Sequence, residues 1–123
     1  DFLAELSPEE GLAWLMRLPG VGLKTASLVL LFNFGKPVLP VDTHVHRVSG
    51  RLGLIPAKMS AERAHGALRA LLPEDAGVLY TFHVTMLRHG QQLCVWGRPR
   101  CAPCPLKDLC DWYAEHGELR DPD

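Results

Sequence analysis

The apolar positions along the chain recur at helical spacing, and no run of β-branched residues bounded by turns stands out as a strand. The pattern therefore predicts an all-α fold. Residues favoured at helix N-termini stand at four points, which are Ser7, Asp42, Ser60 and Asp75. With their caps included, the expected helices span residues 7–17, 23–33, 42–52, 60–72 and 75–89, and a short one begins at Pro105.

The segment 18–22, Leu-Pro-Gly-Val-Gly, must separate the first two helices. Proline disfavours a helix interior, and two closely spaced glycines permit a positive φ in a tight turn. The helix that follows is unusual because residues 25–34 are apolar on nearly every face, so it has to be surrounded by protein. Either the other helices wrap it fully or part of the wrapping is missing from this chain.

Composition is ordinary for one folded domain, with 123 residues, 47% of them hydrophobic and 22% charged. No apolar run approaches the roughly 18 residues of a membrane span, and no signal-peptide pattern marks the start, so we expect an intracellular, cytoplasmic protein with no membrane partner. The net charge of −1 conceals an uneven distribution, because residues 11–60 carry six basic side chains against the single acid Asp42. An anionic ligand would meet the middle of the chain.

The Gly-x-Gly turn at residues 20–22 lies directly before a helix. The free N–H groups of the turn and of the first helical turn would point outward, with the positive end of the helix dipole behind them, which suits a phosphate. Taken alone, such a turn is more often a tight helix–helix connection without a ligand. A dinucleotide fingerprint is a poor match, because a helix precedes the turn and no third glycine follows.

Two longer motifs carry more information. Residues 18–26 read Leu-Pro-Gly-Val-Gly-x-Lys-Thr-Ala, and residues 41–45 read Val-Asp-Thr-His-Val, followed by Arg-Val at 47–48. Together they resemble the helix-hairpin-helix DNA glycosylases, specifically the endonuclease III branch. The resemblance implies a helix-hairpin-helix and a C-terminal iron–sulfur cluster loop, with the N-terminal half of the family's helical barrel missing. It would place the hairpin and catalytic aspartate in residues 1–53 and a helical cluster domain in residues 54–123.

The resemblance also assigns two catalytic residues. Lys24 matches the nucleophile of the bifunctional members, and Asp42 matches the family's essential carboxylate. A neutral lysine amine can attack C1′ of a damaged nucleotide, expel the base and form a Schiff base that permits β-elimination. This implies base-excision DNA repair by a DNA N-glycosylase with abasic-site lyase activity. The alternative is a non-catalytic DNA-binding module that keeps the hairpin and cluster without a lesion pocket.

The implied partner is double-stranded DNA that contains damaged bases or abasic sites, in a nucleoid-associated protein that is monomeric when its barrel is complete. His44 belongs to the Asp-Thr-His turn, whereas His44 and His46, two apart on a helix, do not suit a metal pair. The residues expected to contact DNA are Leu18, Pro19, Gly20, Val21, Gly22, Lys24, Thr25 and His44, joined by Arg98 and Arg100.

All the cysteines of the chain, Cys94, Cys101, Cys104 and Cys110, fall within 17 residues at the spacing C-x6-C-x2-C-x5-C. Intracellular thiols stay reduced, so disulfides fit poorly. Thiolates at this spacing can hold zinc or a four-iron cluster, although zinc sites usually bring two C-x2-C knuckles. The family resemblance implies a [4Fe-4S] cluster. Two arginines lie between the first two cysteines, where a metal-pinned loop would present them to phosphates.

Overall fold

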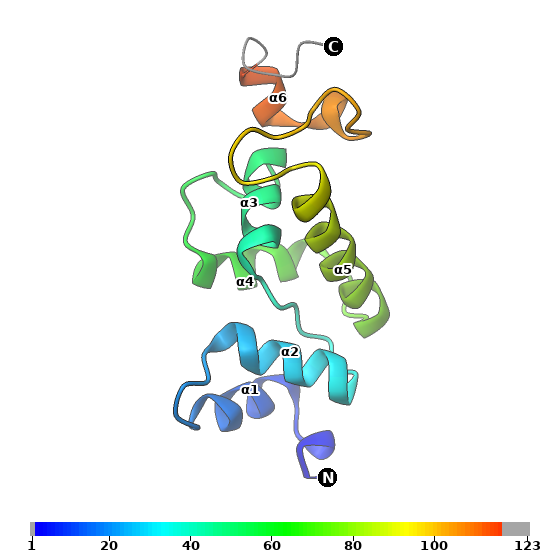
Figure 1. Cartoon of the computed structure of the whole chain (residues 1–123). Helices are drawn as coiled ribbons and strands as arrows, with labels where there is room; N and C mark the ends of the chain where they lie inside the picture. The colour runs from blue at the N-terminus through cyan, green and yellow to red at the C-terminus, as the bar shows by residue number, and fades with distance from the viewer. Residues whose placement is uncertain (1, 117–123) are drawn as a thin grey trace.

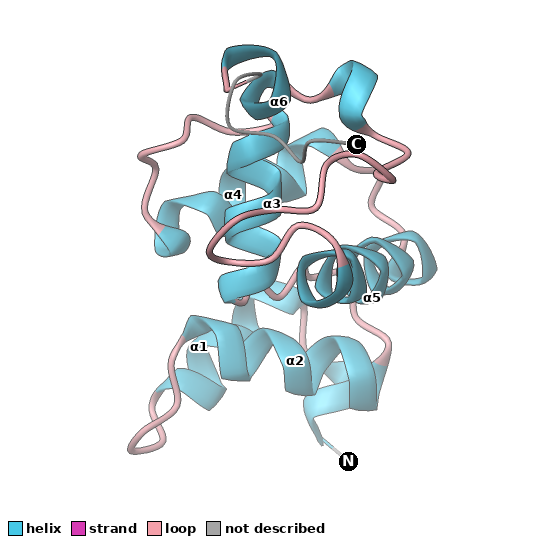
Figure 2. Ribbon diagram, turned by 45° about the horizontal axis from the view of Figure 1, so that its top comes forward, coloured by secondary structure: helices cyan, strands magenta, loops and turns pink. Residues whose placement is uncertain are grey.

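The computed structural model describes residues 2–116 and confirms an all-helical fold, because none of those residues lies in a β-strand (Figures 1 and 2). The α-helices of this part are α1 (Pro8–Met16), α2 (Leu23–Phe34), α3 (Thr43–Leu52), α4 (Ala61–Leu71), α5 (Ala76–Gln92) and α6 (Asp111–Glu115). Two 3-10 segments accompany them, η1 (Phe2–Glu5) and η2 (Lys107–Leu109). No helix of the described part has both the length and the apolarity needed to cross a membrane.

The helices are arranged in three groups along the molecule (Figure 1). Helices α1 and α2 pack as a pair at one end, α3, α4 and α5 form the middle, and α6 lies with η2 at the other end. Helix α3 packs most extensively on α5 and also contacts α4 and α6. It therefore links the cysteine-containing end of the molecule to the rest of the fold.

The predicted helix starts are confirmed by side-chain caps. Ser7 Oγ accepts a hydrogen bond from the Glu10 N–H at 3.1 Å, and Glu10 Oε1 accepts one from the Ser7 N–H at 2.9 Å, which completes a capping box. The side chains of Asp42, Ser60 and Asp75 cap α3, α4 and α5, each by accepting a hydrogen bond from the N–H three residues later. These starts follow from local chemistry, and the sequence was therefore sufficient to find them.

Two helix boundaries differ from the prediction by more than one residue, and η1 was not expected. Helix α5 runs to Gln92, three residues past the expected end at His89. The prediction that the last helix begins at Pro105 is wrong, because α6 begins at Asp111. The intervening N–H groups bond to carbonyls three residues earlier, as from Leu109 to Leu106, and such bonds wind tight turns in place of an α-helix.

Helix α2 is only partly covered by the described residues. Leu30 and Leu31 are buried, whereas the Phe32 side chain is 48% exposed. The Phe32 ring contacts that of Tyr80 on α5, which is 46% exposed, at a centroid distance of 5.1 Å. The apolar surface of α2 thus continues onto α5 as an exposed aromatic pair.

The proposed domain boundary at residue 53 stays a prediction.

Gly90 allows the close approach of α3 and α5, and we expect Gly90→Ala to destabilise the fold. An added Cβ would lie 2.9 Å from the Cβ of His44, which is fixed to the α3 backbone, so the helices would have to separate. Overpacking of this kind costs about 1–3 kcal/mol. Gly66→Ala on α4 is the matched control, because its added Cβ meets no atom within 4 Å. Denaturant unfolding measures both, and equal stability of the two variants would contradict this account of the contact.

Candidate functional site

The turn between α1 and α2 contains the predicted hairpin residues. Gly20 adopts a left-handed φ of 80°, and the Val21 N–H closes the turn on the Leu18 carbonyl at 3.2 Å. Gly22 is the N-cap of α2 and contributes no side-chain cap, so the N–H groups of the first turn keep their capacity to bind an anion. The surface here is open, because a Cβ at Gly20 or Gly22 would meet no atom within 4 Å. Lys24 and Thr25 lie exposed in this first turn of α2.

Asp42 is the N-cap of the next helix, α3, and is half-buried. Its Oδ1 accepts a hydrogen bond from the Val45 N–H at 2.8 Å. The residues just before it are held by two histidines, since the Pro40 carbonyl accepts from His83 Nδ1 and the Val41 N–H donates to His65 Nε2. The two predicted catalytic residues thus stand at the N-termini of successive helices, in a region of excess positive charge.

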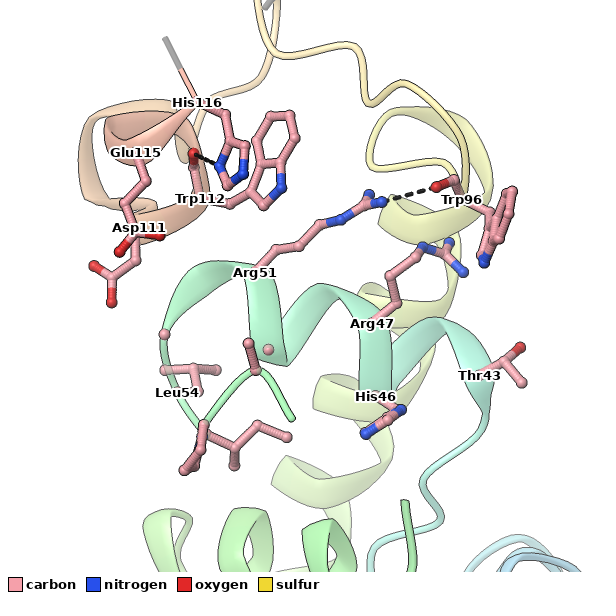
Figure 3. A pocket seen from close by; sticks show the side chains of 15 residues that line it. Thr43, His46, Arg47, Arg51, Leu54, Trp96, Asp111, Trp112, Glu115 and His116 are labelled. Carbon is pink, nitrogen blue, oxygen red and sulfur yellow. Dashed lines mark hydrogen bonds between the residues drawn. The ribbon is translucent and has the colours of Figure 1, made fainter. Parts of the chain in front are cut away.

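Two arginines of α3 reach across to the loop that follows α5 (Figure 3). Arg47 donates to the carbonyls of Gly90 and Cys94 at 2.9 and 3.1 Å, and to His44 Nδ1 at 3.0 Å. These bonds satisfy carbonyls at the C-terminal end of α5. Burial, and then the charge of Arg51, lower the pKa of Arg47 below its ordinary value.

Arg51, one helical turn later, binds the next residues of the same loop. It donates to the carbonyls of Val95 and Trp96 at 2.7 and 2.8 Å, and to the Sγ of Cys94 at 3.3 Å. Its guanidinium also lies over the ring of Trp112 on α6 at 5.6 Å (Figure 3). Helix α3 therefore has Asp42 at its N-terminus, and its residues Arg47 and Arg51 hydrogen-bond to the segment that contains Cys94.

The four cysteines lie on the wall of one cavity between α3, α5 and the C-terminal segment, and none of them forms a disulfide. Cys110 donates to the Arg51 carbonyl at 3.4 Å, and Cys104 Sγ lies 3.6 Å from His89 Nε2. Burial lowers the pKa of His89. Within residues 2–116, no three histidine, cysteine or acidic side chains are grouped closely enough to hold a single metal ion.

The charges around this cavity are suited to thiolates. Its wall includes the cations Arg51, Arg100 and Lys107, and none of its described lining residues is acidic. Arg98 and Arg100 lie exposed on either side of the buried Pro99, in the loop between the first two cysteines. The neighbouring Trp96 side chain is 81% exposed. This loop therefore presents two cations and an aromatic ring to solvent.

No protein-family model matches the chain. Over 109 residues it is 42% identical to endonuclease III of Thermotoga maritima, an alignment that covers 89% of this chain and 50% of that protein. The chain is thus similar in sequence to the C-terminal portion of endonuclease III. It is also 43% identical over 108 residues to the Bacillus subtilis endonuclease III and 39% identical over 105 residues to the Escherichia coli protein. These alignments cover 46% and 48% of the two relatives, so the chain spans about half of their length, in the C-terminal portion.

Solved structures agree with this relationship. A non-covalent endonuclease III–DNA complex matches at a TM-score of 0.77 with 38% identity, covering 86% of this chain and 49% of that one. A trapped endonuclease III–DNA covalent intermediate matches at 0.76, also with 38% identity, covering 85% and 48%. The chain thus shares its fold with about half of each of those proteins.

The sequence analysis assigned no role to the arginines and histidines that hold the backbone around the site, although Arg47 lies within the second motif. Arg47 and Arg51 are four apart on one helix face, where like charges repel unless they share acceptors, so their spacing was an available signal. His65 and His83 gave no such signal. Their partners are backbone groups 24 and 43 residues away, which only the fold brings near.

Proposed function

We propose that this chain is the hairpin and cluster half of a base-excision DNA repair enzyme, a DNA N-glycosylase with abasic-site β-lyase activity that acts on damaged bases in duplex DNA. The observation that carries the proposal is the 42% identity to an endonuclease III over 109 residues, which include both motifs that bear the candidate catalytic residues. The match to two DNA-bound endonuclease III structures supports DNA as the partner.

In this proposal Lys24 is the nucleophile. Its amine attacks C1′ as the C1′–N bond to the base breaks, and the sugar ring opens to leave a Schiff base between Lys24 and C1′. Loss of a C2′ proton then expels the 3′ phosphate by β-elimination. Asp42 acts as the proton acceptor and as counter-charge to the cation that develops at C1′. Its position as the only acid in residues 11–60 supports that role.

The hairpin is proposed to bind the DNA backbone. The uncapped start of α2 offers backbone N–H groups and a positive dipole end, which suit a phosphate. The open surface in front of Gly20 and Gly22 leaves room for the strand to approach. Thr25 lies in the same first turn, and Arg98 and Arg100 are proposed to contact further phosphates from the cysteine loop. The role of His44 as a DNA contact is part of the same proposal.

The cavity lined by the four cysteines is proposed to hold a [4Fe-4S] cluster. In such a cluster each thiolate binds a different iron, so the four sulfurs surround a body larger than one ion. Cysteines that share one cavity without forming a single-ion site are compatible with this arrangement. The cations on the wall offset the negative charge of the thiolates, and Arg51 donates directly to Cys94 Sγ. A cluster held by these cysteines would cross-link the loop, and Arg98 and Arg100 would then present positive charge to DNA.

A borohydride trapping assay tests the proposed function. The 123-residue chain is incubated with duplex DNA that contains one abasic site, and borohydride reduces any Schiff base to a stable adduct. The proposal requires an adduct. The alternative, a non-catalytic DNA-binding module, is favoured by the chain spanning only half of its relatives, and it requires DNA binding without an adduct.

Asp42→Asn is expected to lower base release and strand cleavage by about 100-fold or more, since the counter-charge and proton acceptor are lost. Asparagine caps helices well, so the free energy of unfolding should change by less than about 1 kcal/mol. Ser60→Asn, at the α4 cap, is the control for a cap exchange without a role in the reaction. Wild-type rates in Asp42→Asn would remove the carboxylate from the mechanism.

A further inference from the structure

We propose that His65 and His83 position Asp42 by holding a single peptide group, the one that joins Pro40 to Val41, from two sides. The inference rests on the proposed function of Asp42 and extends it to two residues outside the hairpin and the family motifs.

The geometry joins three elements at one point. His83 on α5 donates from Nδ1 to the Pro40 carbonyl at 3.1 Å. His65 on α4 accepts at Nε2 from the Val41 N–H at 3.2 Å. The carbonyl and the N–H belong to the same planar peptide, so the two bonds together resist its rotation. The proline ring fixes φ at residue 40, which leaves little freedom in the chain that leads to Asp42.

The hydrogen-bond roles of both imidazoles are determined by their partners. A carbonyl can only accept, so His83 carries a proton on Nδ1. His65 Nδ1 lies 2.9 Å from the Ala61 carbonyl and donates to it, which leaves the Nε2 lone pair free for Val41. This arrangement requires a neutral His65, and burial lowers the pKa of that imidazole. The charge of Glu62 on α4 acts on this imidazole in the opposite direction, and Arg69 on α4, Glu9 on α1 and Glu74 line the same groove.

The Pro40 carbonyl and its bond to His83 lie in the core, whereas His65 reaches the Val41 N–H from a partly buried position. Val41 is 2% exposed and His83 is 3% exposed, and the Phe32 ring packs edge-on against the His83 ring at 5.8 Å. Asp42 follows this peptide directly, and its Oδ1 accepts a hydrogen bond from the Val45 N–H. Displacement of the Asp42 backbone would therefore move both the α3 cap and the direction of the carboxylate.

Buried histidines are often no more than satisfied core residues, and the test has to separate that role from positioning. Leucine at position 65 or 83 keeps bulk and removes the hydrogen bond. Glutamine at position 65 offers an amide oxygen near the place of Nε2, and asparagine at position 83 offers an N–H near the place of Nδ1. The four variants are therefore His65→Leu, His65→Gln, His83→Leu and His83→Asn. His46→Leu is the control, because His46 also bonds a distant carbonyl, that of Met59 at 2.6 Å, without touching the clamped peptide.

Two measurements are made on the whole chain. The first is the exchange rate of the Val41 and Val45 amide protons by NMR, which does not depend on activity. The second is the single-turnover rate of adduct formation with abasic DNA, measured beside the Kd for the same DNA. The leucine variants should exchange faster at both amides and lose about 10- to 100-fold in single-turnover rate, with Kd changed less than about threefold. His65→Gln and His83→Asn should recover most of the rate, and His46→Leu should keep the wild-type rate.

Unchanged Val41 exchange in the leucine variants would overturn the clamp. A weaker Kd with an unchanged single-turnover rate would also overturn it. So would an equal loss of rate in His46→Leu, because a general loss of stability would then explain the result. Failure of the wild-type chain to form any adduct would instead overturn the proposed function, and with it the catalytic purpose of the clamp. The exchange rates would then still decide whether the two histidines hold the peptide.

Discussion

Replacement of Lys24 by alanine is expected to abolish covalent capture of the chain by abasic DNA. The adduct forms through a lysine amine, and no neighbouring residue of the exposed first turn of α2 offers another. Loss of a nucleophile typically reduces a rate by on the order of a thousandfold or more. The hairpin backbone is untouched, so the affinity for DNA should fall only by the contribution of one charge.

Lys24→Arg and Lys58→Ala are the matched controls for this experiment. Arginine keeps the positive charge at the hairpin and cannot form the Schiff base, so DNA binding should stay near wild type while capture is lost. Lys58 lies exposed in the loop between α3 and α4, and its removal should leave capture unchanged. Capture of Lys24→Ala at the wild-type rate would show that the nucleophile lies elsewhere.

Replacement of Cys104 by alanine is expected to remove most of the iron from the purified chain. The wild-type chain should be brown, with about four iron and four sulfide per molecule, because a cluster held by four thiolates has that composition. Metal binding contributes directly to folding, so the segment from Cys94 to Cys110 should lose protection from hydrogen exchange in the variant. Helices α1 and α2, at the opposite end of the molecule, should retain theirs.

Pro103→Ala is the control for this loop, because Pro103 is exposed beside Cys104 and provides no thiol. It should keep the iron and the colour. One zinc per chain in a colourless wild-type protein would contradict the cluster proposal and favour the zinc site that the cysteine spacing left open.

The fold followed from the sequence wherever the determining chemistry is local. A capping box needs only Ser7 and Glu10, three residues apart, and the α3 cap needs only Asp42 and its own helix. The C-terminal helix did not follow. The N–H groups of the residues after Pro105 are hydrogen-bonded in tight turns beside the cysteines. Neither hydrophobic periodicity nor a capping residue in the sequence predicts these turns in place of a helix.

The candidate site likewise has a part that the sequence predicts and a part that only the folded chain reveals. Lys24, Asp42 and the four cysteines could be proposed from the sequence because their motifs are contiguous or nearly so, and their roles stay predictions. The bonds that hold these groups in place run to backbone carbonyls and N–H groups, which every residue possesses. Arg51 bonds to the loop 45 residues later, and His83 to a carbonyl 43 residues earlier. The spacing of Arg47 and Arg51 hinted at shared acceptors, but the identity of these distant backbone partners has no signature in the sequence and becomes visible only when the chain is folded.

Peptide mapping of the borohydride-trapped adduct tests the central claim most directly. The chain has four lysines, Lys24, Lys36, Lys58 and Lys107, and each falls in a separable segment of the sequence. The account predicts one DNA-derived sugar fragment per adduct, attached at Lys24. An adduct attached at any of the other three lysines, or no adduct with a chain that still binds abasic DNA, would contradict it.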